Sequence, residues 1–239
     1  MPRVKAYIET DVLTEAKKRI HHIFDIFDTV VVMFSGGKDS LACLHLVHEV
    51  MQERGITKPL DVVFRDEELI PDEVIDFVDE YRRKDWIRMV WFTVPLASTK
   101  YVLGVVRSYV QWDPARAWVR EKPAWGESLP PGDDRVFDQY SMDGFTAQRY
   151  RGKVAFLTGI RAAESLIRYR ACVNKLNENY INAVVESVVG LEHHQRLAFF
   201  FGRSAASFSS SSSSAIIGTG LELRDVSGFS QDVTVSVET

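Results

Sequence analysis

The residues best suited to chemistry form one short segment, Ser35-Gly36-Gly37-Lys38-Asp39-Ser40. It follows an apolar, largely β-branched run at 29–34, typical of a buried parallel strand, and it precedes a helical pattern. Two adjacent glycines allow the backbone to approach a ligand closely, and the N–H groups of a helix N-terminus attract anions. Lys38 adds a full positive charge, while Ser35 and Ser40 add hydroxyl donors. This strand-to-helix turn is therefore predicted to hold a phosphate group, although its spacing matches neither the Walker loop nor the GxGxxG motif.

Acidic residues follow the second predicted strand, 60–65, in the order Asp66-Glu67-Glu68. Because the carboxyl ends of parallel strands meet at one edge of a sheet, these acids would lie near the phosphate-binding turn. We take Asp66 first and Glu67 second as candidate site residues. Loop acids that are simply solvated are the alternative.

A third candidate segment runs from Gly159 to Arg170, after the last predicted strand. Arg161, then Glu164 or Ser165, then Arg168 follow one another at helical spacing and so share a face. The planar guanidinium of arginine binds oxyanions through two hydrogen bonds at once. An oxyanion site is one interpretation of this face, and a ladder of ion pairs on a solvated helix is the other.

The elements that must position these segments alternate between helices and strands. Helices are predicted at 11–27, 40–55, 71–81, 99–110 and from about 162, and strands at 29–34, 60–65, 89–94 and 154–158. This alternation favours an α/β fold, a doubly wound and mostly parallel sheet with helices on both faces. Ligands of such sheets bind beyond the carboxyl ends of the strands, where the candidate segments are expected.

Two stretches depart from the alternation. Residues 111–150 are rich in tryptophan and proline, and we interpret them as an irregular, substrate-side insertion or lid. A surface excursion that packs its own tryptophans is the alternative. Residues 181–239 contain an unbroken serine run at 209–214 and are expected to form a flexible linker and tail, with a marginal strand within 225–239. The expected division is thus 1–180 for the α/β domain and 181–239 for the tail.

Composition narrows the function classes. The 239 residues carry a formal net charge of −4, which gives no global electrostatic case for a nucleic-acid partner. The apolar segments are too short to span a membrane and the N-terminus shows no secretory pattern, so a cytoplasmic location is expected. Cys43 and Cys172 are too few for a disulfide scaffold, and Cys43 is expected to be buried packing. The histidine pairs at 21–22 and 193–194 are interpreted as non-ligands, and no metal residues are assigned.

Taken together, SGGKDS, FRDEE and GIRAAESLIRYR resemble the motifs of the adenine-nucleotide α-hydrolase (PP-loop ATPase) superfamily, and within it the phosphoadenosine-phosphosulfate (PAPS) reductase-like proteins. The resemblance covers about residues 5–180. It is strongest for the phage and mobile-element branch, which is described as sulfotransferases. Members of this family continue beyond the arginine helix, so the resemblance implies a truncated or replaced C-terminus here.

The resemblance implies a nucleotide site and its residues. The nucleotide-binding positions would be Ser35, Gly36, Gly37, Lys38, Asp39, Ser40, Asp66, Glu67, Gly159, Arg161, Glu164 and Ser165, and the catalytic ones Lys38, Arg161 and Arg168. Asp66 or Glu67 would contact the ribose, the adenine or a metal. The substrate would be ATP, with Mg²⁺, or PAPS. No iron–sulfur cluster is implied, because the required cysteine pairs are missing. The C-terminal Glu-Cys-Gly-Leu-His motif of assimilatory PAPS reductases is also missing, so thioredoxin-coupled sulfite formation is not expected.

Two function hypotheses follow. The first is an enzyme that acts on ATP or PAPS by adenylyl transfer with pyrophosphate release, or by transfer of a sulfur group. The second is an inactive nucleotide-binding module, or a truncated remnant, that works with a partner protein. By family resemblance that partner would be a ParB-like nuclease.

Overall fold

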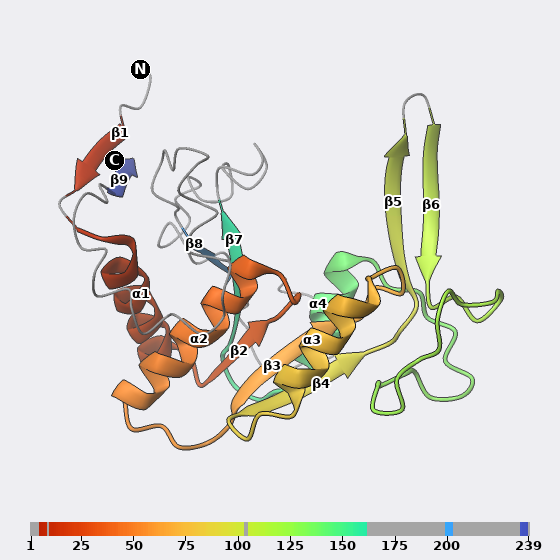
Figure 1. Ribbon diagram of the computed structural model, residues 1–239, viewed down its shortest axis with the longest axis horizontal. Coiled ribbons are helices and arrows are strands. Elements are labelled where there is room, and N and C mark those ends of the chain that lie inside the picture. The colour runs from red at the N-terminus through yellow and green to blue at the C-terminus, as the bar shows by residue number, and fades with distance from the viewer. Residues whose placement is uncertain (1–4, 9, 103–104, 162–198, 203–234, 239) are drawn as a thin grey trace.

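The computed structural model describes residues 5–8, 10–102, 105–161, 199–202 and 235–238 (Figure 1). In chain order the elements are β1 (Lys5–Ile8), α1 (Val12–Ile26), β2 (Thr29–Met33), α2 (Lys38–Glu53), β3 (Leu60–Arg65), α3 (Asp72–Arg82), β4 (Ile87–Phe92), β5 (Leu96–Val102), β6 (Val105–Gln111), α4 (Gln139–Ala147), β7 (Val154–Arg161), β8 (Phe199–Gly202) and β9 (Val235–Glu238).

The central sheet has the order β4-β3-β2-β7-β8, and neighbouring strands run parallel. From β2 the chain moves outward through α2 and α3 to β3 and β4, and it then returns to the opposite side of β2 as β7. The predicted doubly wound α/β fold is confirmed. In such sheets the ligand crevice forms where the strand order reverses, which here lies between the carboxyl ends of β2 and β7.

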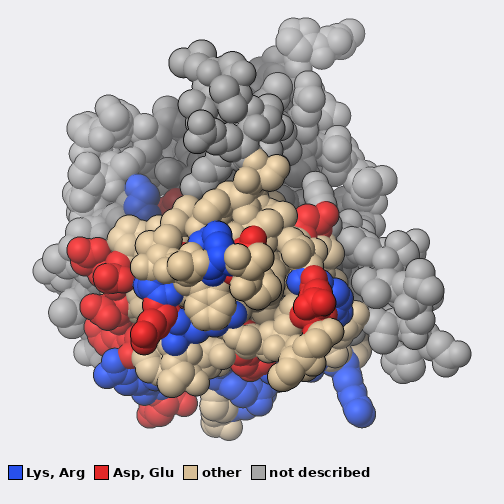
Figure 2. Space-filling view, turned by 90° about the vertical axis from the view of Figure 1, so that its right-hand side faces the viewer, with Lys and Arg blue, Asp and Glu red and all other residues tan. Residues whose placement is uncertain are grey.

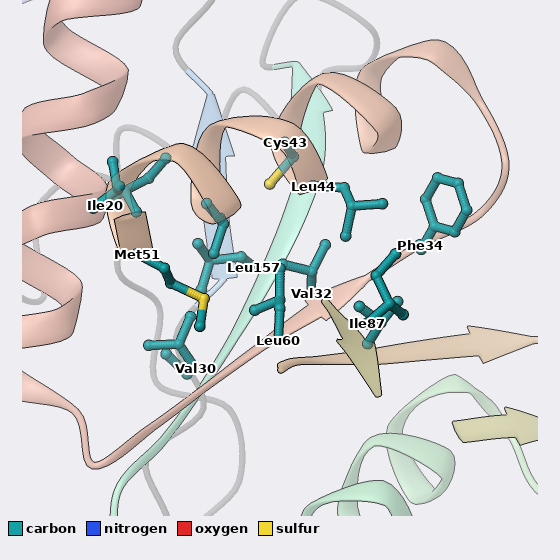
Figure 3. Close-up of a cluster of buried hydrophobic side chains, with 14 of the residues drawn as sticks. Ile20, Val30, Val32, Phe34, Cys43, Leu44, Met51, Leu60, Ile87 and Leu157 are labelled. Carbon is teal, nitrogen blue, oxygen red and sulfur yellow. The ribbon is translucent and has the colours of Figure 1, made fainter. Parts of the chain in front are cut away.

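Both faces of the sheet are buried, which explains the unbroken apolar run of β2. Val30 and Val32 belong to the larger hydrophobic cluster together with Leu44 of α2 (Figure 3). Val31 belongs to a second cluster on the other face, which includes Met142 of α4. Each fully buried side chain of this size contributes about 1.5–3 kcal/mol. Apolar contacts on both faces therefore fix the strand that leads into the phosphate-binding turn.

Cys43 points into the larger cluster and is only 5% exposed (Figure 3). Burial raises the pKa of its thiol to about 12. Its predicted role as buried packing is confirmed, and the thiol cannot supply a thiolate near neutral pH.

The prediction of a helix at 99–110 is wrong. Strands β5 and β6 form an antiparallel hairpin there, with Leu96 opposite Gln111 and Val102 opposite Val105. Valine and tyrosine dominate this stretch, and such β-branched and aromatic residues favour a pleated strand. Spacing alone misled the prediction, because the same valines also recur every three or four residues.

The insertion at 111–150 is not irregular throughout, since it contains α4. A capping box starts this helix: the Asp138 side chain accepts from the Ser141 N–H, and the Ser141 hydroxyl accepts from the Asp138 N–H. This local signal was available in the sequence and was missed.

Two strands come from the stretch predicted as a tail. Strand β8 extends the central sheet beside β7, and β9 pairs antiparallel with β1. The main sheet therefore draws on residues beyond 180, and the proposed boundary at that position stays a prediction. The helix expected from 162 and the serine run at 209–214 lie outside the described residues.

Candidate functional site

The β2–α2 turn is fixed by its own polar groups. The N–H of Phe34 donates to the Val63 carbonyl at 2.9 Å and ties the start of the turn to β3. The Ser40 hydroxyl donates to the Gly37 carbonyl at 2.8 Å and lies 3.0 Å from the Ser35 hydroxyl. It also accepts from the Ser35 N–H at 3.2 Å. The two serines thus shape the turn as well as offering donors to a ligand.

The turn places the N-terminus of α2 at the carboxyl edge of the sheet. The helix begins at Lys38, and its N-cap, Gly37, provides no side-chain hydrogen bond. The first N–H groups of a helix have no intrahelical acceptor, and the helix dipole places partial positive charge there. Lys38 is exposed at this end and Asp39 is partly exposed. The arrangement suits an anion such as a phosphate or sulfate group.

Two glycines make this geometry possible. Gly36 has φ +74°, and a Cβ there would lie 2.7 Å from Val74 Cγ1 and 2.9 Å from Val78 Cγ2 of α3. A Cβ on Gly159 of β7 would meet the Asp39 carbonyl and would lie 2.7 Å from the Ser40 backbone nitrogen. Strand β7 therefore runs directly against the first turn of α2.

The structure thus brings together two of the segments selected from the sequence. Gly159 touches the α2 N-terminus, and Arg161 is the last residue of β7, two positions further along. The side chain of Arg161 lies outside the described residues, and so do Glu164, Ser165 and Arg168. Their predicted roles remain predictions.

Asp66 is buried against protein donors. It is 4% exposed, and its carboxylate accepts from the Trp91 indole N–H at 2.8 Å and forms an ion pair with Arg120. Burial raises the pKa of this carboxyl, while the bonds from Trp91 and Arg120 act in the opposite direction. The geometry favours a structural role over direct contact with a nucleotide. The neighbouring Glu67 is exposed and faces no such network.

Glu68, which sequence reasoning left unassigned, is the most connected acid of the three. Its fully buried carboxylate accepts from the backbone N–H groups of Trp112 and Val119, both at 2.7 Å, and forms an ion pair with Arg116. Burial is the largest single influence and opposes ionisation. The bonds from Arg116, Val119 and Trp112 together outweigh it and lower the pKa of Glu68 to about 2.

These two acids attach the insertion to the loop after β3. The Trp112 indole N–H adds a bond of 2.6 Å to the Asp66 carbonyl. Residues 112–120 are therefore held as a wall beside the carboxyl edge of the sheet, and the interpretation of the insertion as a substrate-side element or lid stays a prediction. The residues that form these ion pairs are visible in the sequence as three consecutive acids and two arginines, Arg116 and Arg120. No local sequence pattern indicates which acid pairs with which arginine, because the partners lie far apart in the chain.

After residues 112–120, the insertion places basic side chains next to aromatic rings. Lys122 donates to the Thr93 carbonyl at 2.8 Å, and its Nζ lies 4.6 Å from the centre of the Trp118 ring. Figure 2, which faces the side where the insertion lies, shows basic and acidic side chains interspersed with uncharged ones. Trp118 and Trp125 remain partly exposed in this region.

The described residues contain neither a cluster of metal-ligating side chains nor a membrane-spanning helix. No group of three His, Cys, Asp or Glu side chains in that part of the chain could hold a metal ion. Within the same residues, no helix is long and apolar enough to cross a membrane.

A doubly wound sheet with a glycine-rich helix start at its switch point is an arrangement typical of α/β domains that bind anionic ligands. The chain belongs to the phosphoadenosine phosphosulfate reductase domain family, whose model matches residues 29–185. It is also similar to the uncharacterized protein YbdN of Escherichia coli, with 29% identity over 177 residues. That match covers 70% of this chain and 43% of YbdN, so the chain spans less than half the length of this relative.

The packing of Gly36 on α3 predicts a difference between two glycine variants. Gly55 has φ +68° and open space around its Cβ position, whereas Gly36 has a similar φ and meets Val74 and Val78. Gly55→Ala should cost about 1–2 kcal/mol through its backbone conformation alone. Gly36→Ala should cost a further ~1–3 kcal/mol, because α3 must move. Urea denaturation measures both, and equal losses would contradict the described packing.

The hydrogen bonds and ion pair of Glu68 predict that its substitution destabilises the protein strongly, whereas substitution of the neighbouring Glu67 has almost no effect on stability. Glu68→Gln places an amide NH2 against one of the two backbone N–H donors and leaves the partly exposed Arg116 without its counter-charge, so it should cost about 1–3 kcal/mol of unfolding free energy. Glu67→Gln removes the same charge from an exposed position and should change stability by less than about 0.5 kcal/mol.

The stability difference between wild type and Glu68→Gln should also depend on pH. Because the pKa is lowered on folding, this stabilisation is fully present above the ordinary value of 4.5 and is lost as the pH falls toward about 2. Denaturation at a series of pH values checks the sign. A difference that widened on acidification would refute the assignment.

Proposed function

We propose that this protein is an enzyme that binds an adenine nucleotide with its phosphate or sulfate groups at the β2–α2 turn. The observation that carries the proposal is the uncapped N-terminus of α2 at the switch point, with Lys38 at its first position. Membership of the phosphoadenosine phosphosulfate reductase domain family supports an adenine nucleotide over other anions.

The roles of the site residues follow from charge. Backbone N–H groups of the turn from Ser35 to Ser40 would hold the anionic groups, and Lys38 would neutralise the charge that develops during group transfer. Arg161 and Arg168 would bind oxyanions on the β7 side, with Glu164 or Ser165 next to them. The protein would therefore act by positioning and charge stabilisation and not through a covalent intermediate.

Two reactions fit this arrangement. With ATP, an acceptor oxygen would form a bond to the α-phosphorus, and the bond from that phosphorus to the bridging oxygen would break. Pyrophosphate would leave together with the Mg²⁺ that accompanies ATP. With PAPS, an acceptor would form a bond to the sulfur, and the bridging S–O bond would break. The electron pair of that bond would remain on the phosphate of adenosine 3′,5′-bisphosphate.

Reduction of PAPS to sulfite is not included in the proposal. That reaction needs a thiolate and a reductant. Cys43 is buried and its thiol pKa is raised, so it is not suited to act as the attacking thiolate. The chain also lacks the cysteine motif of the assimilatory reductases.

Nucleotide titration of the full chain tests the proposal. A ligand at 100 times its Kd adds about 2.7 kcal/mol of stability, which a thermal shift detects easily. Stabilisation by ATP with Mg²⁺ would support adenylyl transfer, with pyrophosphate release as the next assay. Stabilisation by PAPS without metal would support sulfur-group transfer. A response to neither would refute the nucleotide site.

The same titration separates the enzyme from the second hypothesis. Binding without product over hours, with or without a ParB-like nuclease, would replace the enzyme by a nucleotide-binding module that acts through a partner.

Variants at the turn should weaken whichever nucleotide binds. Lys38→Ala and Arg161→Ala each remove one charge-assisted contact, so each should cost about 1–3 kcal/mol, or roughly 5–150-fold in Kd. Lys58→Ala is the matched control, because Lys58 is exposed and precedes β3 at the opposite, amino edge of the sheet. Calorimetry measures all three. Wild-type affinity in both site variants would remove these residues from the site.

A further inference from the structure

An ion pair joins the carboxyl end of β3 to α4. Arg65, the last residue of β3, donates from its guanidinium to the carboxylate of Asp143 on α4. The side chain of Arg65 is 19% exposed and that of Asp143 is 8% exposed, so most of the pair is shielded from water. Neither residue belongs to the β2–α2 turn, and neither was selected from the sequence.

Arg65 lies beside the phosphate-binding turn. Met33 of β2 is opposite Val63 of β3, and the Phe34 N–H donates to the Val63 carbonyl. Two residues after this pair, Ser35 and Arg65 therefore leave the sheet next to each other, on strands about 4.8 Å apart. Doubly wound sheets bind their ligands in the crevice beyond this edge.

Arg65 and the N-terminus of α2 approach this edge from opposite faces of the sheet. Successive strand residues alternate between the faces, so Arg65 shares the face of Val63, which packs in one hydrophobic cluster with Met142 of α4. Leu44 of α2 packs in the cluster on the other face. A ligand that lies across the edge would thus meet the helix N-terminus on one side and Arg65 on the other.

The guanidinium of Arg65 uses little of its hydrogen-bonding capacity. Within the described residues it donates to one carboxylate oxygen, and its buried Nε has no acceptor. Arg88 on β4 provides the contrast, because its Nε and Nη2 donate to the two oxygens of Asp61 at 2.6 and 2.7 Å. A buried donor without an acceptor is costly, so Arg65 would gain from an oxyanion that accepts two hydrogen bonds.

Two further observations single out Arg65. Arg120 also has a buried Nε without an acceptor, but its guanidinium lies over the Trp112 ring, 4.9 Å from the ring centre, as part of the insertion. Burial raises the pKa of Asp143, and the interaction with Arg65 only partly offsets that rise. Asp143 therefore orients the guanidinium of Arg65 without saturating it.

We propose that Arg65 is a further anion-binding residue, which donates two hydrogen bonds to a phosphate or sulfate group of the nucleotide held at the β2–α2 turn. The planar fork of arginine matches two oxygens of such a group. Asp143 is a positioning residue that orients the guanidinium and competes with the ligand for it. The inference rests on the proposed nucleotide site, and it adds a second cation on the face of the sheet opposite α2.

The test uses two substitutions with opposite expected effects, measured by calorimetric titration of the full chain with ATP and Mg²⁺ and with PAPS. Arg65→Met removes the donors and should weaken nucleotide binding by about 10–100-fold, the range for hydrogen bonds to charged groups. Asp143→Asn keeps the shape of the pair but removes the competing charge, so it should strengthen binding by about 2–5-fold. A pair with only a structural role would shift both affinities in the same direction, or neither.

Controls separate binding from folding. Arg65→Met with Asp143→Leu replaces the pair by apolar side chains, a change that proteins tolerate well, and it should bind as weakly as Arg65→Met. Arg88→Met and Asp61→Asn alter the matched ion pair near the amino ends of β3 and β4, and they should leave nucleotide affinity unchanged. Thermal melting shows whether each variant is folded.

The outcomes distinguish this inference from the nucleotide site itself. Wild-type affinity in Arg65→Met, or a folded Asp143→Asn that binds no better than the wild type, would overturn the role of Arg65. If Lys38→Ala weakens binding while Arg65→Met does not, the inference fails and the nucleotide site stands. If the wild type binds neither nucleotide, both proposals fail.

Discussion

The β2–α2 turn is held between α3 and β7 at two glycines that have no room for a side chain. On one side Gly36 places the turn against Val74 and Val78 of α3, and on the other Gly159 places β7 against Asp39 and Ser40. The N-terminus of the helix therefore has almost no freedom to shift relative to β2 and β7. A site that stabilises charge by positioning depends on this kind of rigidity, because preorganised groups need not rearrange during the reaction. The hydrophobic clusters on both faces of the sheet keep the three elements in place.

A second constraint lies one strand away, where buried acids organise the insertion. Asp66 and Glu68 belong to the loop after β3, and they bind arginines that are 54 and 48 residues further along the chain. Buried ion pairs of this kind contribute little net stability compared with apolar packing, but breaking one is costly. They fix which part of the insertion faces the carboxyl edge, and thus the shape that an acceptor would meet there.

The sequence predicted four strands of the central sheet because each is an apolar run with a clear end, whereas β8 lies in the stretch predicted as a tail. The run at 60–65 matches β3, and the phosphate-binding segment lies between β2 and α2 as expected. The hairpin at 96–111 was misread as a helix, because valines spaced by three and four satisfy both patterns and only strand pairing decides between them. Asp66 was selected for the site because of its position in the chain, whereas its burial depends on Trp91 and Arg120, which no local pattern connects to it.

The indole groups around Asp66 give the protein a built-in optical property. Trp91 and Trp112 are each 1% exposed, and both donate their indole N–H to Asp66, one to its carboxylate and the other to its carbonyl. Their fluorescence originates where the sheet and the insertion are joined. The emission of these two of the five tryptophans therefore reports on that junction, so a change in its intensity or wavelength during ligand binding would register a displacement of the insertion without any added label.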